Sequence, residues 1–494
     1  MSRWSFTYRD LLERNASLFS SMPALSTRHR SLTHGELYAR GQALASGLAS
    51  LGVQPGDRLA IVCENRPEML ELLAAAAWLG ACLVPINYRL SADEVRYVLD
   101  DVAPRLAFVS RQYAHLVERL PAGIVQLLLN DADDPADALE ALCRTTSPLG
   151  VRAWDDQAPL VVMHTAAVDG QPKGAILSHR GLVSAAMQMQ ATWRLGPADR
   201  GIGVLPLFHI AGLGLALAVQ SAGGAVLLEE RFEPDRVAEL AEHQGGSVLS
   251  CFPPMLGAVL DSCERRRGQL CHLRVVSGVE SPETIGRLHS MVPHAMFWSA
   301  YGQTETSGTI SLSPFAERPG SAGRPMPLCS VRIVDDVGEN VERGAVGQIM
   351  VRGPGVFRGY WPPAQPRPVA EQDAWHRTDD LGWLDSDGYL WFRGRSKAKD
   401  LIKTGGENVS PAEVERVLKT HPALADAAVL GIPDRTWGEA VKAVCVLRPG
   451  ASATAADIIE YVGERLARFK RPKVVEFVDR VPRLTSGRVD KSAL

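Results

Sequence analysis

The chain has 494 residues, of which 46% are hydrophobic and 22% are charged, and its formal net charge is −3. This is the composition of an ordinary globular protein with enough length for about two to four domains. So small a charge gives no general attraction to nucleic acid or to an anionic membrane, which excludes functions that need a strongly basic surface.

The cysteines and the apolar stretches bear on the compartment. The eight cysteines are scattered and form no CxxC pair, so we interpret them as buried thiols in a reducing cytosol and not as disulfides or a zinc site. The N-terminus, MSRWSFTYRD, has no signal-peptide apolar core. The apolar stretches 69–86 and 210–228 each contain polar or turn-forming residues and are predicted to be a helix, a turn and a buried strand. We therefore expect a cytoplasmic protein without a transmembrane segment.

Helices and short apolar strands alternate from residue 8 to about residue 110. Thr33 is a candidate N-cap because Glu36 follows three residues later, which is the spacing of a capping box. Strands separated by helices indicate parallel βαβ units. The predicted strands are 58–63, 82–86 and 106–109, and the predicted helices are 66–79 and 91–99.

A loop of small residues follows the apolar strand predicted over 160–164. It contains Thr165, Gly170 and Lys173, and a helix is predicted from about Ser178. A strand, a loop with glycine and lysine, and then a helix are typical of a phosphate cradle. The Walker pattern GxxxxGK[ST] is absent, so the loop taken alone leaves a plain turn as the alternative.

Two further candidate positions stand at the ends of predicted strands. His209 follows a strand predicted over 201–206, and Gly278, Val279 and Glu280 follow one predicted over 273–277. Ligands of α/β sheets bind at the carboxyl ends of the strands. A packed, inert histidine is the alternative interpretation of His209.

The segment 299–305, SAYGQTE, combines several chemical functions in seven residues. Tyr301 offers a ring face for a planar base, and Gly302 permits a tight turn. Thr304 could hydrogen-bond a phosphate oxygen, and Glu305 is a hard oxygen ligand suited to Mg²⁺. An ordinary surface turn is the alternative for the segment taken alone.

Short strands separated by Gly, Pro and Asp turns predict an antiparallel β subdomain at about 320–395. Asp380 is placed in a loop of this subdomain, where a carboxylate can take two ribose hydroxyls, and a solvated loop acid is the alternative. Beyond the charged segment 395–400, about 95 residues suffice for a small α+β domain. A basic cluster in that domain, for which solvated surface charge is the alternative, comprises Lys470, Arg471 and Lys473.

These motifs, in this order, resemble the adenylate-forming superfamily of acyl-CoA synthetases, luciferases and non-ribosomal adenylation domains. The resemblance covers nearly the whole chain, and the acyl-CoA synthetase branch that includes feruloyl-CoA synthetase-like enzymes is the most similar. The motifs that indicate this branch are TAAVDGQPKGA, YGQTETSG, RPGSAGRP, RSKAKDLIKTGGENVSPAEVE and WGEAVKAVCVLRPG.

The resemblance implies an α/β fold with a mobile cap. A large domain over 1–396 would contain two α/β subdomains and a small β-barrel, a hinge would lie at 397–400, and an α+β cap would cover 401–494. The implied enzyme is an AMP-forming acid–thiol ligase that uses ATP, Mg²⁺ and coenzyme A to convert a carboxylic acid, fatty or aromatic, to its CoA thioester. The alternatives are a catalytically impaired homologue that binds nucleotide or acyl-CoA, and a ligase that loads a carrier protein. A homodimer is also compatible with the resemblance.

Residue roles follow from matching positions in the family. The implied nucleotide-binding residues are Thr165, Gly170, Lys173, Gly278, Val279, Glu280, Tyr301, Gly302, Gln303, Asp380 and Arg395. The implied catalytic residues are Thr304 at the α-phosphate, Glu305 as the Mg²⁺ ligand, His209 at the wall of the acyl pocket, and Arg488. The implied lining of the pantetheine tunnel is Gly405, Gly406 and Glu407, and the hinge is bracketed by Lys399 and Asp400.

Two positions depart from the family pattern. The phosphate loop usually carries Ser, Thr and Gly where this chain has Ala166, Ala167, Val168 and Asp169. The terminal loop usually carries a lysine where this chain has Arg488, whose planar guanidinium is not equivalent to a compact ammonium. We interpret the loop as a subgroup trait, and Lys491 is an alternative source of the terminal cation.

Overall fold

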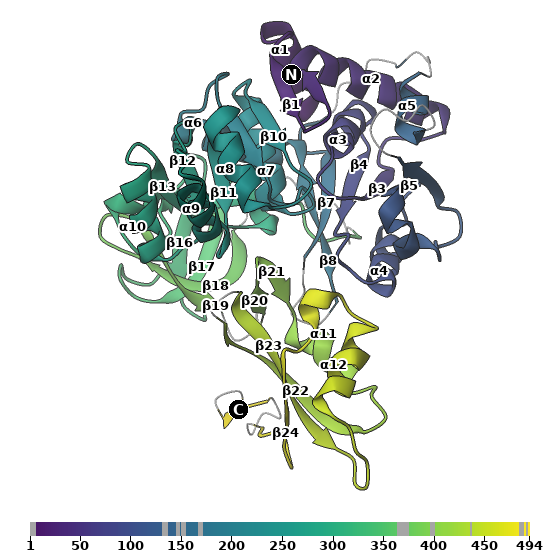
Figure 1. The fold of residues 1–494 in the computed structure, drawn as a ribbon, viewed down its shortest axis with the longest axis vertical. Coiled ribbons are helices and arrows are strands. Elements are labelled where there is room, and N and C mark those ends of the chain that lie inside the picture. The colour runs from purple at the N-terminus through teal and green to yellow at the C-terminus, as the bar shows by residue number, and fades with distance from the viewer. Residues whose placement is uncertain are drawn as a thin grey trace.

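The computed structural model shows a large N-terminal domain of several layers and a small C-terminal domain below it (Figure 1). The large domain holds two mainly parallel sheets and one antiparallel sheet. The residues that the structure describes are 6–130, 137–144, 149, 155–165, 171–362, 375–395, 401–434, 437–483, 489–490 and 493–494.

The first sheet has six strands in the order β6-β5-β3-β4-β7-β8. All its neighbouring strands are parallel except the last pair, which forms an antiparallel hairpin. The βαβ units predicted near the N-terminus are therefore present. The strands are β3 (Arg58–Val62), β4 (Cys82–Ile86), β5 (Leu106–Ser110), β6 (Val125–Leu129), β7 (Pro159–Thr165) and β8 (Lys173–Ser178).

The second sheet has nine strands in the order β15-β14-β13-β12-β11-β9-β10-β1-β2. Its last two strands, β1 and β2, come from the start of the chain. The N-terminal segment therefore belongs to the second sheet, although the strands of the first sheet follow it directly in the sequence. The strands are β1 (Pro23–Ser26), β2 (Ser31–Thr33), β9 (Arg200–Gly203), β10 (Ala225–Leu228), β11 (Gly246–Cys251), β12 (Val275–Gly278), β13 (Met296–Gln303), β14 (Gly308–Pro314) and β15 (Arg324–Pro325).

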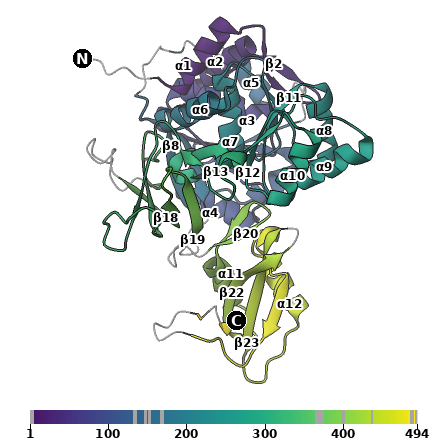
Figure 2. The same cartoon turned by 90° about the vertical axis from the view of Figure 1, so that its left-hand side faces the viewer.

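Helices fill the space between the two sheets and cover their outer faces (Figures 1 and 2). The described helices include none that is long and apolar enough to cross a membrane. Both apolar stretches that raised this question are a buried helix followed by a buried strand, as predicted. The inner helices are α1 (Tyr8–Leu18), α2 (His34–Ser50), α3 (Pro67–Leu79), α6 (His179–Trp193) and α7 (Ile210–Ser221), and the outer ones are α4 (Ala92–Val102), α8 (Pro234–His243), α9 (Met255–Arg266) and α10 (Pro282–Met291).

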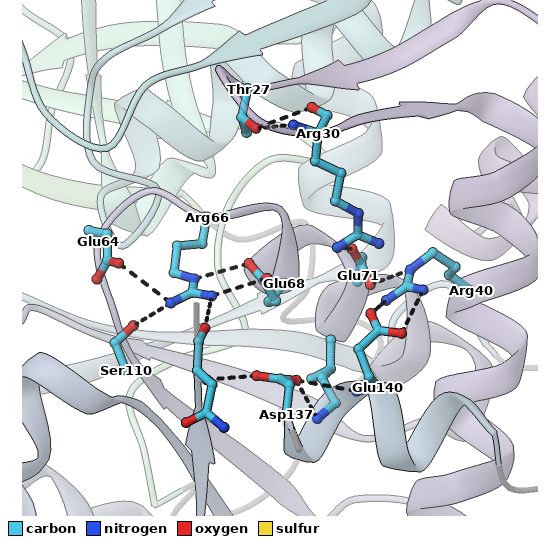
Figure 3. Close-up of polar contacts among 12 residues, drawn as sticks. Thr27, Arg30, Arg40, Glu64, Arg66, Glu68, Glu71, Ser110, Asp137 and Glu140 are labelled. Carbon is cyan, nitrogen blue, oxygen red and sulfur yellow. Dashed lines mark hydrogen bonds and ion pairs between the residues drawn. The ribbon is translucent and has the colours of Figure 1, made fainter. Parts of the chain in front are cut away.

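A cluster of charged side chains around a buried carboxylate connects three helices of the first subdomain (Figure 3). Glu71 on α3 is fully buried and lies 3.0 Å from Arg30 and 2.7 Å from Arg40. Arg40 on α2 also contacts Glu140 on the short helix α5 (Ala138–Cys143). Because a buried charge is stable only when it is paired, this cluster fixes how the helices pack against one another.

The predicted antiparallel β subdomain is a four-stranded sheet in the order β16-β17-β18-β19. It occupies the region where we expected a small β-barrel. The turn predicted before its last strand is present, because Gly388 has a φ of +82° and its N–H donates to the Asp385 carbonyl. The strands are β16 (Ser330–Val334), β17 (Gly347–Arg352), β18 (His376–Leu384) and β19 (Leu390–Arg395).

The small C-terminal domain is an α+β unit with its own apolar core. Its sheet has the order β21-β20-β23-β22, with β24 parallel to β23. The expected hinge residues Lys399 and Asp400 lie outside the described residues. The elements are β20 (Ile402–Thr404), β21 (Glu407–Val409), α11 (Pro411–Leu418), β22 (Leu424–Asp434), β23 (Gly438–Leu447), α12 (Ala455–Gly463) and β24 (Val474–Phe477).

Candidate active site

The predicted phosphate loop is the tip of a hairpin. Thr165 at the end of β7 pairs with Lys173 at the start of β8. The helix predicted from about Ser178 is confirmed, because Ser178 is the N-cap of α6, but the strand β8 that lies between the loop and this helix was not predicted. Gly170 and the unusual residues 166–169 lie outside the described residues.

The hairpin is anchored to helix α4 near its tip. Nε2 of His164, the residue before Thr165, lies 2.9 Å from the Asp101 carboxylate on α4. The indole of Trp361 donates to the Asp101 carbonyl at 3.0 Å. No sequence pattern indicates this anchor, because its three members come from distant parts of the chain.

The segment SAYGQTE lies mainly on strand β13, and only Thr304 and Glu305 belong to the short 3-10 turn that follows. The prediction that Gly302 permits a tight turn was therefore wrong. Gly302 is required for a different reason: a Cβ atom there would lie 2.1 Å from the Gly308 carbonyl of the neighbouring strand β14. The glycine allows the two backbones to approach at a register shift between Tyr301 and Gly302.

Glu305 joins the two predicted phosphate-binding segments. Its Oε1 accepts hydrogen bonds from the Thr165 hydroxyl at 3.3 Å and from the Tyr360 hydroxyl at 2.9 Å. The ammonium of Lys173 lies 6.0 Å from the centre of the Tyr360 ring. Tyr360 was missed by the sequence reasoning, since a tyrosine after Arg-Gly carries no distinctive pattern. The expected triphosphate-loop residues and the expected metal ligand thus lie together.

Asp380 is buried, with 3% of its surface exposed, and lies on strand β18. Its placement in a loop and the alternative of a solvated acid were therefore wrong. Its Oδ2 accepts from the Tyr301 hydroxyl at 2.7 Å and from the Gln303 amide at 2.5 Å. Burial raises the pKa of Tyr301 well above its ordinary value, and the Asp380 charge adds to this effect. Arg395 lies 3.9 Å from the other Asp380 oxygen.

The predicted segment Gly278-Val279-Glu280 borders Tyr301, because Gly278 pairs with Ser299 in the parallel strands β12 and β13. Gly278 has a φ of +148°, and a Cβ there would lie 1.9 Å from the Cys251 carbonyl. Only glycine fits this position. Val279 is exposed, while burial raises the pKa of Glu280.

His209 follows strand β9 and is held in place by a buried asparagine. Asn65, at the end of β3, donates to the Leu205 carbonyl at 3.0 Å and accepts from the Leu207 N–H at 2.8 Å. The side chain of His209 remains 36% exposed. The alternative of an inert packed histidine does not describe it.

The small domain reaches His209 through Glu407. The Glu407 carboxylate lies 3.2 Å from His209 Nε2 and 2.9 Å from the Arg89 guanidinium. Burial alone would raise the pKa of Glu407, but His209 and Arg89 together lower it to about 2. Gly405 and Gly406 have φ values of +57° and +85° and form the two-residue turn that presents Glu407.

Comparison with known proteins identifies the family of the chain. A model of the AMP-binding enzyme family matches residues 12–361, and a model of the AMP-binding enzyme C-terminal domain matches residues 413–488. The chain belongs to the AMP-binding enzyme family. The family resemblance inferred from the motifs is therefore confirmed, together with the fold class of a large α/β domain and a small domain.

Curated AMP-binding enzymes resemble this chain over almost its full length. An indoleacetate–CoA ligase from Aromatoleum aromaticum is 34% identical over 493 residues, which cover 97% of this chain and 96% of the relative. A feruloyl-CoA synthase from an Amycolatopsis species is 35% identical over 481 residues, covering 95% and 94%. The similarity to feruloyl-CoA synthetase-like enzymes is thus confirmed.

A solved AMP-binding enzyme resembles the whole model, both domains included. It is a double mutant of o-succinylbenzoate CoA synthetase from Bacillus subtilis bound to a product analogue, OSB-NCoA. It is 29% identical, covers 98% of each chain and has a TM-score of 0.85. Because the superposition includes both domains, their relative arrangement here is similar to that of a relative carrying a CoA product analogue.

In this AMP-binding enzyme only the flanks of the predicted terminal loop are described. Arg488 is outside the described residues, but its flanks Arg483 and Val489 pair with each other, and Arg483 contacts Asp426 on β22. Of the residues predicted in the small domain, the structure therefore places Glu407 at the site.

Proposed function

We propose that this AMP-binding enzyme is an ATP-dependent acyl-CoA synthetase that joins a carboxylic acid to coenzyme A and releases AMP and pyrophosphate. The observation that carries the proposal is Glu305, which receives hydrogen bonds from Thr165 on one segment and from Tyr360 on another. Glu305 lies between two further candidate groups. One is Tyr301, whose hydroxyl donates to the buried Asp380, and the other is the loop that ends at the exposed Lys173. The two relatives described above are named as an indoleacetate–CoA ligase and a feruloyl-CoA synthase, which supports the same function.

The nucleotide would bind beside strand β13. Tyr301 and the segment 278–280 offer apolar and backbone surfaces on either side of a planar base. Asp380 would accept the ribose hydroxyls, with Arg395 next to it. Thr165 and Lys173 would face the phosphates from the hairpin, and Thr304 the α-phosphate, with Gly302 and Gln303 completing the wall.

The donor atoms at Glu305 suit Mg²⁺. Among the described residues there is no cluster of three or more potential metal ligands, so a cation here would need phosphate oxygens to complete its shell. Mg²⁺ is bound in this way in many nucleotide enzymes, by one or two carboxylates together with substrate phosphates. When bound, Mg²⁺ neutralises phosphate charge that would otherwise oppose attack by a carboxylate. Thr165 and Tyr360 orient the Glu305 oxygen for this role.

The reaction has two half-reactions. In the first, the oxygen of the substrate carboxylate attacks the α-phosphorus of ATP, the bond to the pyrophosphate oxygen breaks, and an acyl-adenylate forms. In the second, the CoA sulfur attacks the acyl carbonyl, the thiol proton is lost, and AMP leaves. A mixed anhydride is needed because a free carboxylate is a poor electrophile. The observed contact between Glu407 and His209 supports an arrangement suited to the second half-reaction.

The substrate is proposed to be an apolar or aromatic acid. The candidate acyl pocket lies beside His209, near Phe252, Val279 and Gly308. The relatives named for indoleacetate and ferulate act on aromatic acids, which supports this class for the present chain. A panel of aromatic and fatty acids, incubated with ATP, Mg²⁺ and CoA, tests the proposal by mass spectrometry of the acyl-CoA formed. Equal amounts of AMP and pyrophosphate are expected, and folded protein that yields no AMP above background with any acid would refute it.

One rival function rests on a specific observation. Arg488 and the loop 166–169 depart from the family pattern, so a homologue that binds nucleotide without turnover is the second candidate. Binding of ATP in a calorimeter without pyrophosphate release would favour it.

A ligase that loads a carrier protein would be distinguished by competition between CoA and a phosphopantetheinylated acceptor. A homodimer and a cytoplasmic location remain predictions, testable by light scattering and by cell fractionation.

A further inference from the structure

Lys470 is the member of the predicted basic cluster whose environment differs most from the expected one. Solvated charge was the alternative for this cluster, yet Lys470 is only 4% exposed. Its ammonium lies 2.7 Å from the carboxylate of Glu413 on α11 and 2.5 Å from that of Glu94 on α4. Glu413 belongs to the small domain and Glu94 to the large one, so this single cation bridges the two domains.

The first turn of α4 provides further contacts to the same part of the small domain. Glu94 also accepts from the backbone N–H of Ala467 at 2.9 Å, and the Ser91 hydroxyl donates to the Arg465 carbonyl at 3.0 Å. Ser91 and Glu94 are the two members of the capping box of α4. The two residues that cap the N-terminus of α4 therefore also contact the small domain. Figure 1 shows α4 of the large domain next to the small domain.

A movement of the small domain would affect the two partners of Lys470 differently. Glu413 moves together with Lys470, whereas Glu94 stays with the large domain. Any rotation of the small domain that separates α4 from the segment 465–470 therefore breaks the Glu94 contact and keeps the Glu413 contact. Breaking this contact would leave a buried charge without one of its partners, so the contact favours the present arrangement over those in which it is broken.

Lys470 is also coupled to the site residue Glu407. The short helix that contains Lys470 packs against strand β21, which begins at Glu407. Glu94 holding Lys470 and His209 holding Glu407 are therefore two points of attachment of one compact domain. A substitution that breaks the Glu94–Lys470 contact therefore alters the fraction of molecules in which Glu407 contacts His209.

We propose that Glu94 and Lys470 are positioning residues that hold the small domain in the arrangement in which Glu407 meets His209. They accelerate thioester formation and leave adenylation unaffected, because the bridge exists only in the arrangement that brings Glu407 to the site. This inference rests on the proposed function, since it assigns the bridge to one of its two half-reactions.

The test separates the half-reactions in the full-length enzyme with an acid that the substrate panel identifies. Glu94→Gln keeps the capping box, which accepts Gln as well as Glu, and removes the charge that faces Lys470. Asp93→Asn is the matched control, because Asp93 is the neighbouring carboxylate on the same turn and is exposed. Acyl-adenylate formation is measured by rapid quench without CoA, and its conversion to thioester is measured after CoA is added.

Glu94→Gln is expected to form the adenylate within about twofold of wild type and to convert it to thioester about ten to a hundred times more slowly, the range that one charged hydrogen bond represents. Asp93→Asn is expected to leave both rates unchanged. Thioester formation at the wild-type rate in Glu94→Gln would overturn the inference, as would an equal fall of both rates in a variant that melts like wild type. Lys470→Gln is expected to show the same split. If wild type itself forms no adenylate with any acid, the proposed function fails instead.

Discussion

The carboxylate of Glu407 in the small domain lies 3.2 Å from Nε2 of His209 in the large domain. The residues come from a glycine turn and from the end of a parallel strand, and 198 positions separate them in the sequence. Arg89 contacts the same carboxylate, and the Asn87 amide donates to it at 3.3 Å, so three side chains hold the turn that carries Glu407 against the large domain. The face of the small domain that carries Glu407 is therefore the face that borders the candidate site.

The contact is expected to depend on pH in a defined range. The pKa of Glu407 is about 2, well below its ordinary value of 4.5, because His209 and Arg89 outweigh the effect of burial. Its stabilising contribution is therefore complete above pH 4.5 and is lost as the pH falls from 4.5 towards 2. The shift corresponds to about 3 kcal/mol. X-ray scattering should show no loosening of the domain arrangement as the pH falls from 8 to 5, and a loosening on acidification in that range that Glu407→Gln abolishes would contradict the assignment.

Asp380→Asn is expected to weaken ATP binding. The substitution turns one carboxylate oxygen into an NH2 group, which cannot accept a ribose hydroxyl and removes the negative charge, while the remaining oxygen can still accept from Tyr301 and Gln303. We expect the Kd for ATP to rise about ten- to a hundredfold, as for the loss of hydrogen bonds to a charged group. Asp379→Asn is the control, because this neighbouring carboxylate is half exposed and pairs with Arg377 on the surface. Calorimetry checks both, and equal affinities of the two variants would exclude Asp380 from the nucleotide site.

Glu71→Gln is expected to destabilise the large domain without touching the site. The substitution leaves Arg30 and Arg40 partly buried without their shared anion (Figure 3). Removal of one partner of a buried ion pair costs about 3 kcal/mol of unfolding free energy. Asp100→Asn breaks the exposed pair with Arg96 and should cost less than about 1 kcal/mol. Urea denaturation distinguishes them, and similar midpoints for both variants would show that the cluster is not a stabilising one.

Arg488→Ala is expected to slow acyl-adenylate formation about 10²–10³-fold, as for removal of one preorganised donor from an active site. Arg488→Lys should retain or raise the rate, because an ammonium restores the residue that the family pattern has at this position. The measurement is pyrophosphate release in the absence of CoA. A wild-type rate in Arg488→Ala together with a loss in Lys491→Ala would transfer the role to Lys491.

Much of the local structure could be predicted from the sequence where apolar runs are bounded by Gly or Pro. Strand 82–86 has its predicted bounds. The Thr33–Glu36 capping box is also present. These features depend on neighbours within a few residues, and the sequence shows those neighbours directly.

The errors concern residues whose environment is set by distant parts of the chain. Asp380 looked like a loop acid because its partner Tyr301 is 79 residues away. Lys470 looked solvated because Glu94 is 376 residues away and lies in the other domain. Gly302 was taken for a turn residue, although the constraint on it is the backbone of the strand beside it. Residue type and spacing could not reveal which polar groups folding would bury together.

The most direct test of the central claim is the rate of acyl-adenylate formation in Glu305→Gln at saturating ATP and Mg²⁺. The amide keeps the size of the side chain and can still accept from Thr165 and Tyr360, but it lacks the negative charge that a divalent cation requires. We expect a folded variant that melts like wild type and forms the adenylate about 10²–10³ times more slowly. Formation at the wild-type rate would contradict the assignment of Glu305 and, with it, the site described around it.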